Sequence, residues 1–104
     1  MLVAGSWILD WERYRVVLNG ELLDLPLKRL RLLSIFIANP DRVVFRNEIK
    51  KQLWNNWEQI ADATVDKEVE RLRVCLRGAV PKCPIKTVRG QGYLFSTEEI
   101  TSVP

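Results

Sequence analysis

The sequence predicts an α+β fold, with an antiparallel β-sheet at the N-terminus, a core of three helices and a β-hairpin at the C-terminus. Three observations carry this prediction. Short runs that carry β-branched and aromatic residues occur within the first 25 positions, apolar residues then recur at helical spacing, and strand-like runs return around a Gly-Gln-Gly tip. With 104 residues and 47% apolar content, the chain suits a single domain. We expect its core over residues 5–96 and a frayed tail over 97–104.

The N-terminal strands are predicted by the runs SWILDW, YRVVLN and GELLDL. Asn19-Gly20 lies between the last two runs and is a strong signal for a two-residue hairpin turn. The runs therefore predict an antiparallel meander rather than an internal repeat.

Helical spacing predicts a helix over Leu27–Ala38, which Asn39-Pro40 ends because the residue before proline disfavours the α conformation. Pro26 stands where serine or threonine would cap this helix, although proline is tolerated in a first turn. A second, short helix is predicted over Arg46–Trp54, with Trp54 directed inward. The segment 55–63 (NNWEQIADA) lacks periodicity and is expected to form a loop.

The third helix, predicted over Thr64–Arg77 and ended by Gly78, has two different faces. A narrow apolar stripe faces the core and consists of Val65, Val69, Leu72 and Leu76. The opposite face carries Lys67, Glu70, Arg71 and Val74, and one flank carries Asp66, Arg73 and Arg77.

The basic outer face of this helix suits the major groove of B-DNA. Arg71 is central enough to reach O6 and N7 of guanine, whereas Arg73 and Arg77 are better directed at phosphates. Glu70 and Asp66 could accept from cytosine N4 or orient neighbouring arginines. The alternative for this helix, taken alone, is an ordinary amphipathic helix with a solvated charged face.

The C-terminal hairpin is predicted from strands over Ile85–Arg89 and Gly92–Phe95. A Gly-x-Gly beside Arg89 could cradle a nucleotide phosphate, but that motif opens a helix and no helix follows here. Gly90 and Gly92 are instead predicted to form a tight turn that needs positive φ, with Arg89 at its tip. Three helices followed by a hairpin form the winged helix-turn-helix arrangement.

Composition argues against an enzyme or a metal centre. The chain has no histidine, the commonest general base and zinc ligand, and Cys75 and Cys83 alone cannot close a structural zinc site. We expect no cofactor and no small-molecule substrate. No stretch is long enough to span a membrane and no signal peptide opens the chain, so the cytoplasm, associated with the nucleoid, is the expected compartment.

Positive charge is concentrated in the last third of the chain. The net charge of the chain is +3. Residues 64–95 hold seven Lys/Arg and three Asp/Glu, a net charge of +4, so all other residues together carry a net charge of −1. This distribution favours a polyanionic partner, above all double-stranded DNA.

Two runs together, ATVDKEVERLRVCL and IKTVRGQGYLFS, resemble the C-terminal DNA-binding domain of OmpR/PhoB-type response regulators of two-component systems. Leu32-Leu33, the NPDRVV stretch and Leu53-Trp54 fall at matching spacings, so the resemblance covers residues 5–96. It implies a four-stranded N-terminal sheet, a third helix in the major groove and a wing at the minor groove. It also implies head-to-tail protomers on direct-repeat operators.

The resemblance implies roles for particular residues. Lys67 and Arg71 match positions that face bases. Positions at or near the DNA backbone, or at the wing, are matched by Trp54, Thr64, Glu70, Arg73, Thr87 and Arg89. The loop between the second and third helices contacts RNA polymerase in activators, which here implicates Asn56, Trp57, Glu58 and Ile60. Trp57 and Ile60 could equally serve loop packing.

Several positions depart from the family pattern. Ala63 stands where arginine often meets a phosphate, and Arg29 stands where glutamate is usual. Glu68 and Glu70 replace neutral or basic residues and would repel phosphate. These departures predict a different operator and weaker binding by one domain alone.

Two questions stay open at this point. The chain has no receiver domain, so it could be a piece of a response regulator, the cytosolic domain of a ToxR-like membrane regulator, or a stand-alone regulator. The alternative function is a winged-helix module that docks RNA polymerase or another protein without specific DNA readout.

Overall fold

The computed structural model describes residues 1–97 and begins with a four-stranded antiparallel sheet in the order β1-β2-β3-β4. Its strands are β1 (Leu2–Ala4), β2 (Trp7–Asp10), β3 (Arg15–Leu18) and β4 (Glu21–Leu23). The local patterns predicted the last three, and the family resemblance implied four. Trp7, Leu9, Val16 and Leu18 alternate along β2 and β3 and are buried on the inner face of the sheet.

The three predicted helices are present as α1 (Leu27–Ala38), α2 (Arg46–Leu53) and α3 (Asp62–Leu76). The bounds of α1 match the prediction, and Pro26 gives it no side-chain cap. Three bounds differ. Trp54 is extended after α2, α3 begins two residues before Thr64, and α3 ends at Leu76 rather than at Arg77. Asp62 in the first turn of α3 suits the helix dipole, a start signal that the apolar pattern does not contain.

The expected loop between α2 and α3 contains a short 3₁₀ helix, η1 (Trp57–Gln59). Its backbone is closed by hydrogen bonds from Gln59 N to Asn56 O and from Ile60 N to Trp57 O, at 2.9 and 3.1 Å. The lack of α-helical periodicity correctly excluded a longer helix, but such a single turn carries no periodic signal.

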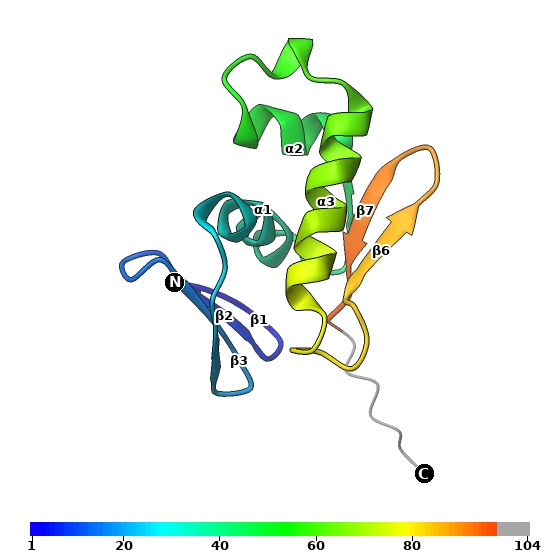
Figure 1. Cartoon of the computed structure of the whole chain (residues 1–104). Coiled ribbons are helices and arrows are strands. Elements are labelled where there is room, and N and C mark those ends of the chain that lie inside the picture. The colour runs from blue at the N-terminus through cyan, green and yellow to red at the C-terminus, as the bar shows by residue number, and fades with distance from the viewer. Residues whose placement is uncertain (98–104) are drawn as a thin grey trace.

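A second sheet, in the order β5-β7-β6, combines β5 (Val43–Phe45) with β6 (Ile85–Val88) and β7 (Gly92–Phe95). The β6–β7 hairpin is the predicted wing, and β5 is a strand that the sequence prediction missed. In Figure 1, α1 lies between the N-terminal sheet and α3, and the wing leans outward on the other side of α3. This order and packing confirm the winged helix-turn-helix α+β fold.

Gly90 and Gly92 serve two different purposes, which corrects the prediction that both need positive φ. Gly90 has φ +74° at the wing tip, as predicted. Gly92 lies in β7 opposite Phe45, where a Cβ atom would stand 2.1 Å from the carbonyl oxygen of Val44. Glycine at position 92 is therefore required by the close approach of two strands, not by a turn conformation.

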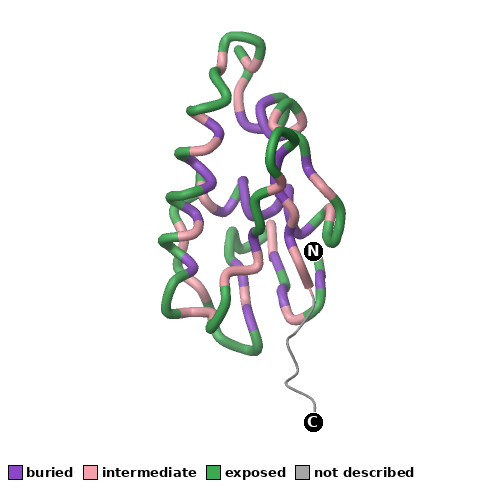
Figure 2. The backbone as a smooth tube through the Cα atoms, turned by 90° about the vertical axis from the view of Figure 1, so that its right-hand side faces the viewer, coloured by how far each residue is buried: buried purple, intermediate pink, exposed green. Residues whose placement is uncertain are grey.

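One apolar core joins the helices to both sheets. Phe95 of β7 stacks on Phe36 of α1 with ring centroids 6.3 Å apart and meets Trp7 of β2 edge-on at 5.4 Å. Figure 2 shows α3 with buried residues toward the rest of the molecule and exposed residues on its outer side. The core therefore fixes which face of α3 is presented to a partner.

The described chain ends beside the turn that follows α1. Thr97 donates its backbone N–H to Asp41 Oδ1 at 2.9 Å and its hydroxyl to Asp41 Oδ2, so this first residue of the predicted tail is anchored. The remainder of the predicted tail, residues 98–104, lies outside the described residues. Over residues 1–97, none of the helices has the length and apolar character to cross a membrane.

Candidate nucleic-acid interface

The outer face of α3 is the centre of the candidate interface. Val65, Val69, Leu72 and Leu76 are fully buried, as the helical spacing predicted. Lys67, Glu70, Arg71 and Val74 are exposed on the opposite face. Because the buried stripe ties α3 to the core, its basic face is held outward by a rigid element.

Glu68 corrects one expectation about this face. Its carboxylate is buried, with a side chain only 5% exposed, and it accepts from Arg29 Nη1 of α1 at 2.5 Å. Burial between α1 and α3 keeps this carboxylate from direct contact with a phosphate, although its negative charge remains below the exposed face of α3. The departures at positions 29 and 68 therefore form one ion pair.

The Arg71 side chain is exposed and makes one hydrogen bond within residues 1–97, to Glu68. Its Nη1 donates to Glu68 Oε1 at 2.9 Å, and its side chain remains 59% exposed. An arginine has five N–H donors, so this single bond leaves enough donors for a bidentate contact with a base. The predicted base-facing residue is thus both accessible and oriented.

Arg73 is engaged by the wing. Its Nη2 donates to the Thr87 hydroxyl at 2.8 Å and to the Ile85 carbonyl at 3.0 Å, and its guanidinium lies 5.4 Å from the Tyr93 ring centre. Sequence reasoning directed both Arg73 and Thr87 at DNA but did not place them together. Through this contact Arg73 connects α3 to the wing.

Asp66 forms a second link between α3 and the wing. Its Oδ1 accepts from the Tyr93 hydroxyl at 2.5 Å and from Arg46 Nε of α2 at 2.9 Å. Burial and the hydrogen bond to Asp66 raise the pKa of Tyr93 to about 12, although Arg46 opposes the shift. Asp66, predicted to meet cytosine or to orient an arginine, orients Arg46 in this structure.

Glu70 lies between two arginines on the exposed face. Its carboxylate is 3.4 Å from Arg77 Nη2 and 3.6 Å from Arg73 Nη1. Arg77 is 71% exposed, so this long contact leaves it accessible to a phosphate. Surface pairs of this kind contribute little to stability and are easily exchanged for a phosphate.

The half-buried Trp54 lies near a cation that sequence reasoning missed. Lys28 Nζ, at the start of α1, stands 5.2 Å from the Trp54 ring centre and 3.5 Å from Glu68 Oε1. Lys28 is about half exposed, which makes it a further candidate for a backbone contact. Only the packing of α1 beside α2 and α3 brings it to this side.

Arg89 and Thr64 lie at the margins of the interface. Arg89 is exposed at the wing tip, next to Gly90, as expected. Thr64 is half-buried in the first turn of α3. Nearby, Lys50 donates to Asp62 Oδ1 at 2.7 Å, and this bond lowers the pKa of Asp62.

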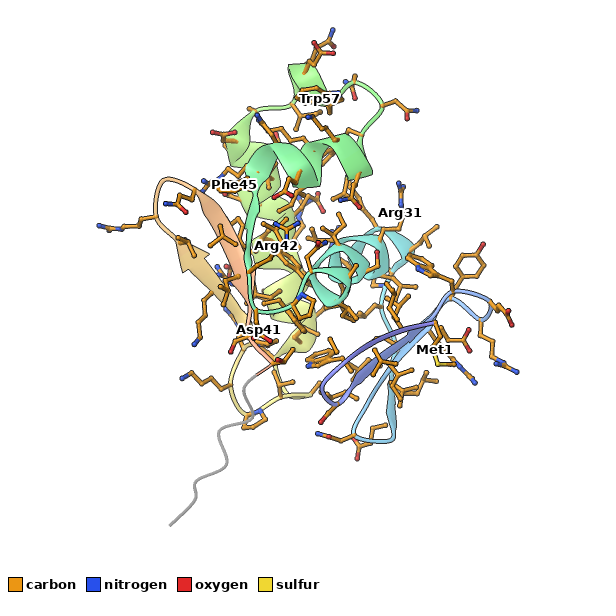
Figure 3. All side chains as sticks on the ribbon, turned by 180° about the vertical axis from the view of Figure 1, so that it is seen from behind. Met1, Arg31, Asp41, Arg42, Phe45 and Trp57 are labelled. Atoms are coloured by element: carbon orange, nitrogen blue, oxygen red, sulfur yellow. The ribbon has the colours of Figure 1, made fainter. Side chains whose placement is uncertain are left out.

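The η1 segment forms a separate surface. Trp57 is half-buried beneath Lys51, whose Nζ lies 4.9 Å from its ring centre, whereas Asn56 and Glu58 are exposed. Ile60 packs against the core, which favours loop packing for this residue. Figure 3 shows Trp57 at the opposite end of the molecule from Met1.

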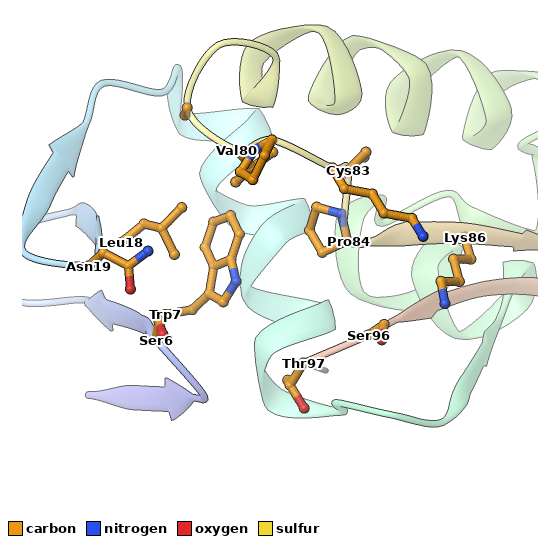
Figure 4. Close-up of a pocket in the computed structure, with 13 residues that line it drawn as sticks. Ser6, Trp7, Leu18, Asn19, Val80, Cys83, Pro84, Lys86, Ser96 and Thr97 are labelled. Carbon is orange, nitrogen blue, oxygen red and sulfur yellow. The ribbon is translucent and has the colours of Figure 1, made fainter. Parts of the chain in front are cut away.

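An open cleft of about 640 Å³ lies between the N-terminal sheet and the connector from α3 to β6. Trp7 and Leu18 line one side of it, and Pro84 and Lys86 line the other (Figure 4). Within residues 1–97, no three His, Cys, Asp or Glu side chains are close enough to hold a metal ion.

The sequence matches known regulators over most of its length. A family model described as "Transcriptional regulatory protein, C terminal" matches residues 20–95. The phosphate regulon transcriptional regulatory protein PhoB of Pseudomonas aeruginosa is 34% identical over 95 residues, which are 91% of this chain and 41% of PhoB. The chain thus spans about two fifths of the length of this relative.

The fold matches solved DNA complexes. The DNA-binding domain of response regulator AdeR, in complex with an intercistronic region, has a TM-score of 0.80 at 26% identity, over 90% of this chain and 97% of that one. The RstA DNA-binding domain of Klebsiella pneumoniae, in complex with the RstA box, has a TM-score of 0.74 at 28% identity, over 93% and 98% of the two chains.

Proposed function

The chain belongs to the family of C-terminal domains of transcriptional regulatory proteins, the OmpR/PhoB-type effector domains, and we propose on that premise that it binds double-stranded DNA sequence-specifically. The resemblance read from the sequence is confirmed by this membership. The proposed activity is binding alone, and regulation follows from where the domain sits on a promoter.

One observation carries the proposal. The exposed face of α3 presents Lys67 and Arg71, and a hairpin with Arg89 at its tip is fastened beside the same helix. A rigid helix with a basic outer face fits the major groove, and a hairpin beside it can reach the adjoining backbone or minor groove. Both elements are therefore available to one DNA duplex.

Base readout is assigned to Arg71 and Lys67. Arg71 can contact guanine O6 and N7, a bidentate pair that contributes about 1–3 kcal/mol of discrimination against a wrong base. Lys67 lies one turn earlier on the exposed face and would address a neighbouring base pair.

Backbone binding is assigned to residues around this centre. Arg77 and Arg89 would contribute affinity and salt dependence without reading sequence. Trp54, Thr64 and Thr87 would position the duplex, with Arg73 holding Thr87 in place and Glu70 exchanging its arginine partners with phosphates. Lys28, beside Trp54, joins this group.

Two protomers would bind a direct repeat head to tail, as the family resemblance implies. The outer face of α3 would then lie in successive major grooves, with repeats one helical turn apart or nearly so. A protein–protein contact between neighbouring domains is compatible with this arrangement but is not needed for each domain to read its own half-site.

The second candidate function is docking of RNA polymerase or another protein through the η1 segment. Trp57 together with the exposed Asn56 and Glu58 favours it, because a partly exposed aromatic beside polar residues is typical of an interface anchor. Ile60 packs against the core and thereby holds the η1 segment in position for such a contact. In an activator this function would accompany DNA binding, and as the sole function it would take the place of specific DNA readout.

Selection from a random library of duplex DNA, followed by footprinting, tests the proposal. Enrichment of a direct repeat with protection in successive major grooves is expected. Failure to enrich any sequence, with the domain folded, would contradict specific binding and would favour the protein-docking alternative.

A further inference from the structure

The carboxylate of Glu68 meets three cations with its two oxygens. Oε2 accepts from Arg29 Nη1 at 2.5 Å, and Oε1 accepts from Arg71 Nη1 at 2.9 Å with Lys28 Nζ at 3.5 Å. One oxygen therefore faces inward to α1, and the other faces the residues that would approach DNA. The buried carboxylate of Glu68 therefore connects α1 to the exposed face of α3 that carries Arg71.

The two arginines on Glu68 have different surroundings. The Arg29 side chain is 17% exposed and the Glu68 side chain 5%, so the inner pair is held in a packed frame. Arg71 is 59% exposed, so its guanidinium reaches outward from that frame. The ordering of Arg71 is thereby supplied by the folded domain before any DNA arrives.

We propose that Glu68 is a positioning residue for specificity: anchored by Arg29, it holds the Arg71 guanidinium toward one base pair. The proposal rests on the proposed function, because the direction of Arg71 matters only if Arg71 reads a base. Charge-assisted bonds to a carboxylate are short and directional, which suits this task.

Glu68 has two effects on binding that act in opposite senses. Its negative charge below the basic face weakens attraction to any duplex. Its bond to Arg71 removes the cost of immobilising a long side chain when the correct base is met. Loss of the carboxylate should therefore strengthen binding to random DNA and weaken the preference for the operator.

Glu68→Gln is the direct test, made with the duplex that the wild-type domain enriches and a scrambled duplex of equal composition. The ratio of the two affinities is expected to fall about three- to tenfold, the equivalent of one unfixed side chain. Asp10→Asn is the matched control, because it removes a carboxylate that pairs with an exposed arginine, Arg13, at the end of β2 rather than on α3, and it should leave the ratio unchanged.

A double-mutant cycle shows whether the effect passes through Arg71. In an Arg71→Ala background, Glu68→Gln should change the ratio by less than twofold, since no oriented arginine remains. An equal loss in both backgrounds would overturn the proposal. An unchanged ratio in Glu68→Gln alone would also overturn it.

A charge-swapped variant separates positioning from stability. Arg29→Glu combined with Glu68→Arg restores an ion pair between α1 and α3 but places a like charge beside Arg71. We expect the melting temperature to recover from that of Glu68→Arg alone while operator preference stays low. Recovery of preference together with stability would show that Glu68 serves only the packing of α1 on α3.

The outcomes also separate this inference from the proposed function. If the wild-type domain enriches no sequence, the proposed function fails and this inference fails with it. If the wild type enriches an operator and Glu68→Gln keeps the wild-type ratio, only the role of Glu68 is refuted.

Discussion

Arg73 of α3 donates a hydrogen bond to the hydroxyl of Thr87 in β6 at 2.8 Å. The same guanidinium nitrogen also donates to the Ile85 carbonyl at 3.0 Å. Two side chains that sequence reasoning directed at DNA independently therefore contact each other. The bond fixes the wing relative to α3, so under the proposed function the contacts of α3 and of the wing with DNA would be coupled through Arg73.

The first prediction is that Arg73→Lys lowers the free energy of unfolding by about 1–2 kcal/mol and weakens DNA binding nearly as much as Arg73→Ala. Lysine keeps the positive charge but cannot span two acceptors with a planar fork. Chemical denaturation and binding isotherms measure both effects. Arg77→Lys is the control, because the Arg77 side chain is 71% exposed and its one hydrogen-bond partner within residues 1–97 is Glu70, at 3.4 Å.

A different result would reassign Arg73. If Arg73→Lys keeps wild-type stability and affinity while Arg73→Ala loses one unit of salt dependence, then its charge acts directly on a phosphate.

The second prediction is that Arg89→Ala weakens binding to specific and random DNA alike and reduces the slope of log K against log salt by about one unit. Arg89 is exposed at the wing tip, where it would neutralise a phosphate without reading a base. Binding titrations at several salt concentrations give the slope. Arg15→Ala, on the N-terminal sheet, should leave it unchanged, and an unaltered slope in Arg89→Ala removes Arg89 from the interface.

The third prediction separates the two wing glycines. Gly92→Ala should lower the free energy of unfolding by about 3 kcal/mol, because its Cβ would overlap the Val44 carbonyl across β5 and β7. Gly90→Ala should cost only about 1 kcal/mol, because it has open space and only the strain of positive φ. Urea denaturation compares them, and equal costs would show that β5 and β7 can move apart.

The fourth prediction concerns alkaline pH. The pKa of Tyr93 is about 12 in the folded chain, against 10.0 for a free tyrosine, because burial and Asp66 favour the neutral hydroxyl. Because folding raises the pKa of Tyr93, its neutral hydroxyl contributes fully to the free energy of unfolding below pH 10. This contribution is lost as the pH rises toward 12.

Tyrosinate absorbance and thermal melts against pH test this expectation. Tyr93→Phe should remove the component that titrates near pH 12 and weaken the alkaline loss of stability. Titration of Tyr93 at the value of a free tyrosine would contradict its buried bond to Asp66.

The fifth prediction concerns Trp57 in η1. Trp57→Ala should leave DNA affinity unchanged and reduce activated transcription severalfold, because an interface anchor is lost without change to α3. Transcription with purified RNA polymerase measures the effect at a promoter carrying the enriched site. Tyr14→Ala removes an exposed aromatic elsewhere and should have no effect, and full activity of Trp57→Ala would assign Trp57 to loop packing.

Much of the fold could be predicted because it is encoded locally. The helical spacing in α1 and the Asn19-Gly20 turn each lie within a short stretch, and the structure confirms both. The local patterns missed the three-residue strands β1 and β5, because both are stabilised by their partners and neither is marked by a turn signal such as the Asn19-Gly20 pair that precedes the equally short β4. The start of α3 was placed late because an apolar pattern does not mark a polar first turn.

The sequence by itself determined the fold class, the family, the buried stripe of α3 and the basic character of its opposite face. Those properties depend on spacing along one element. The tertiary structure decided which charges are available. It joins Arg29 to Glu68 across 39 residues, Arg73 to Thr87, and Gly92 to the Val44 carbonyl.

In KTVRGQGYLF, the sequence predicted a wing tip, whereas the structure assigns Gly90 to the turn and Gly92 to contact between strands. Such assignments require the distance between segments that meet only after the core has packed. Distance, together with burial, sets the strength of each charge pair, and a single sequence contains neither.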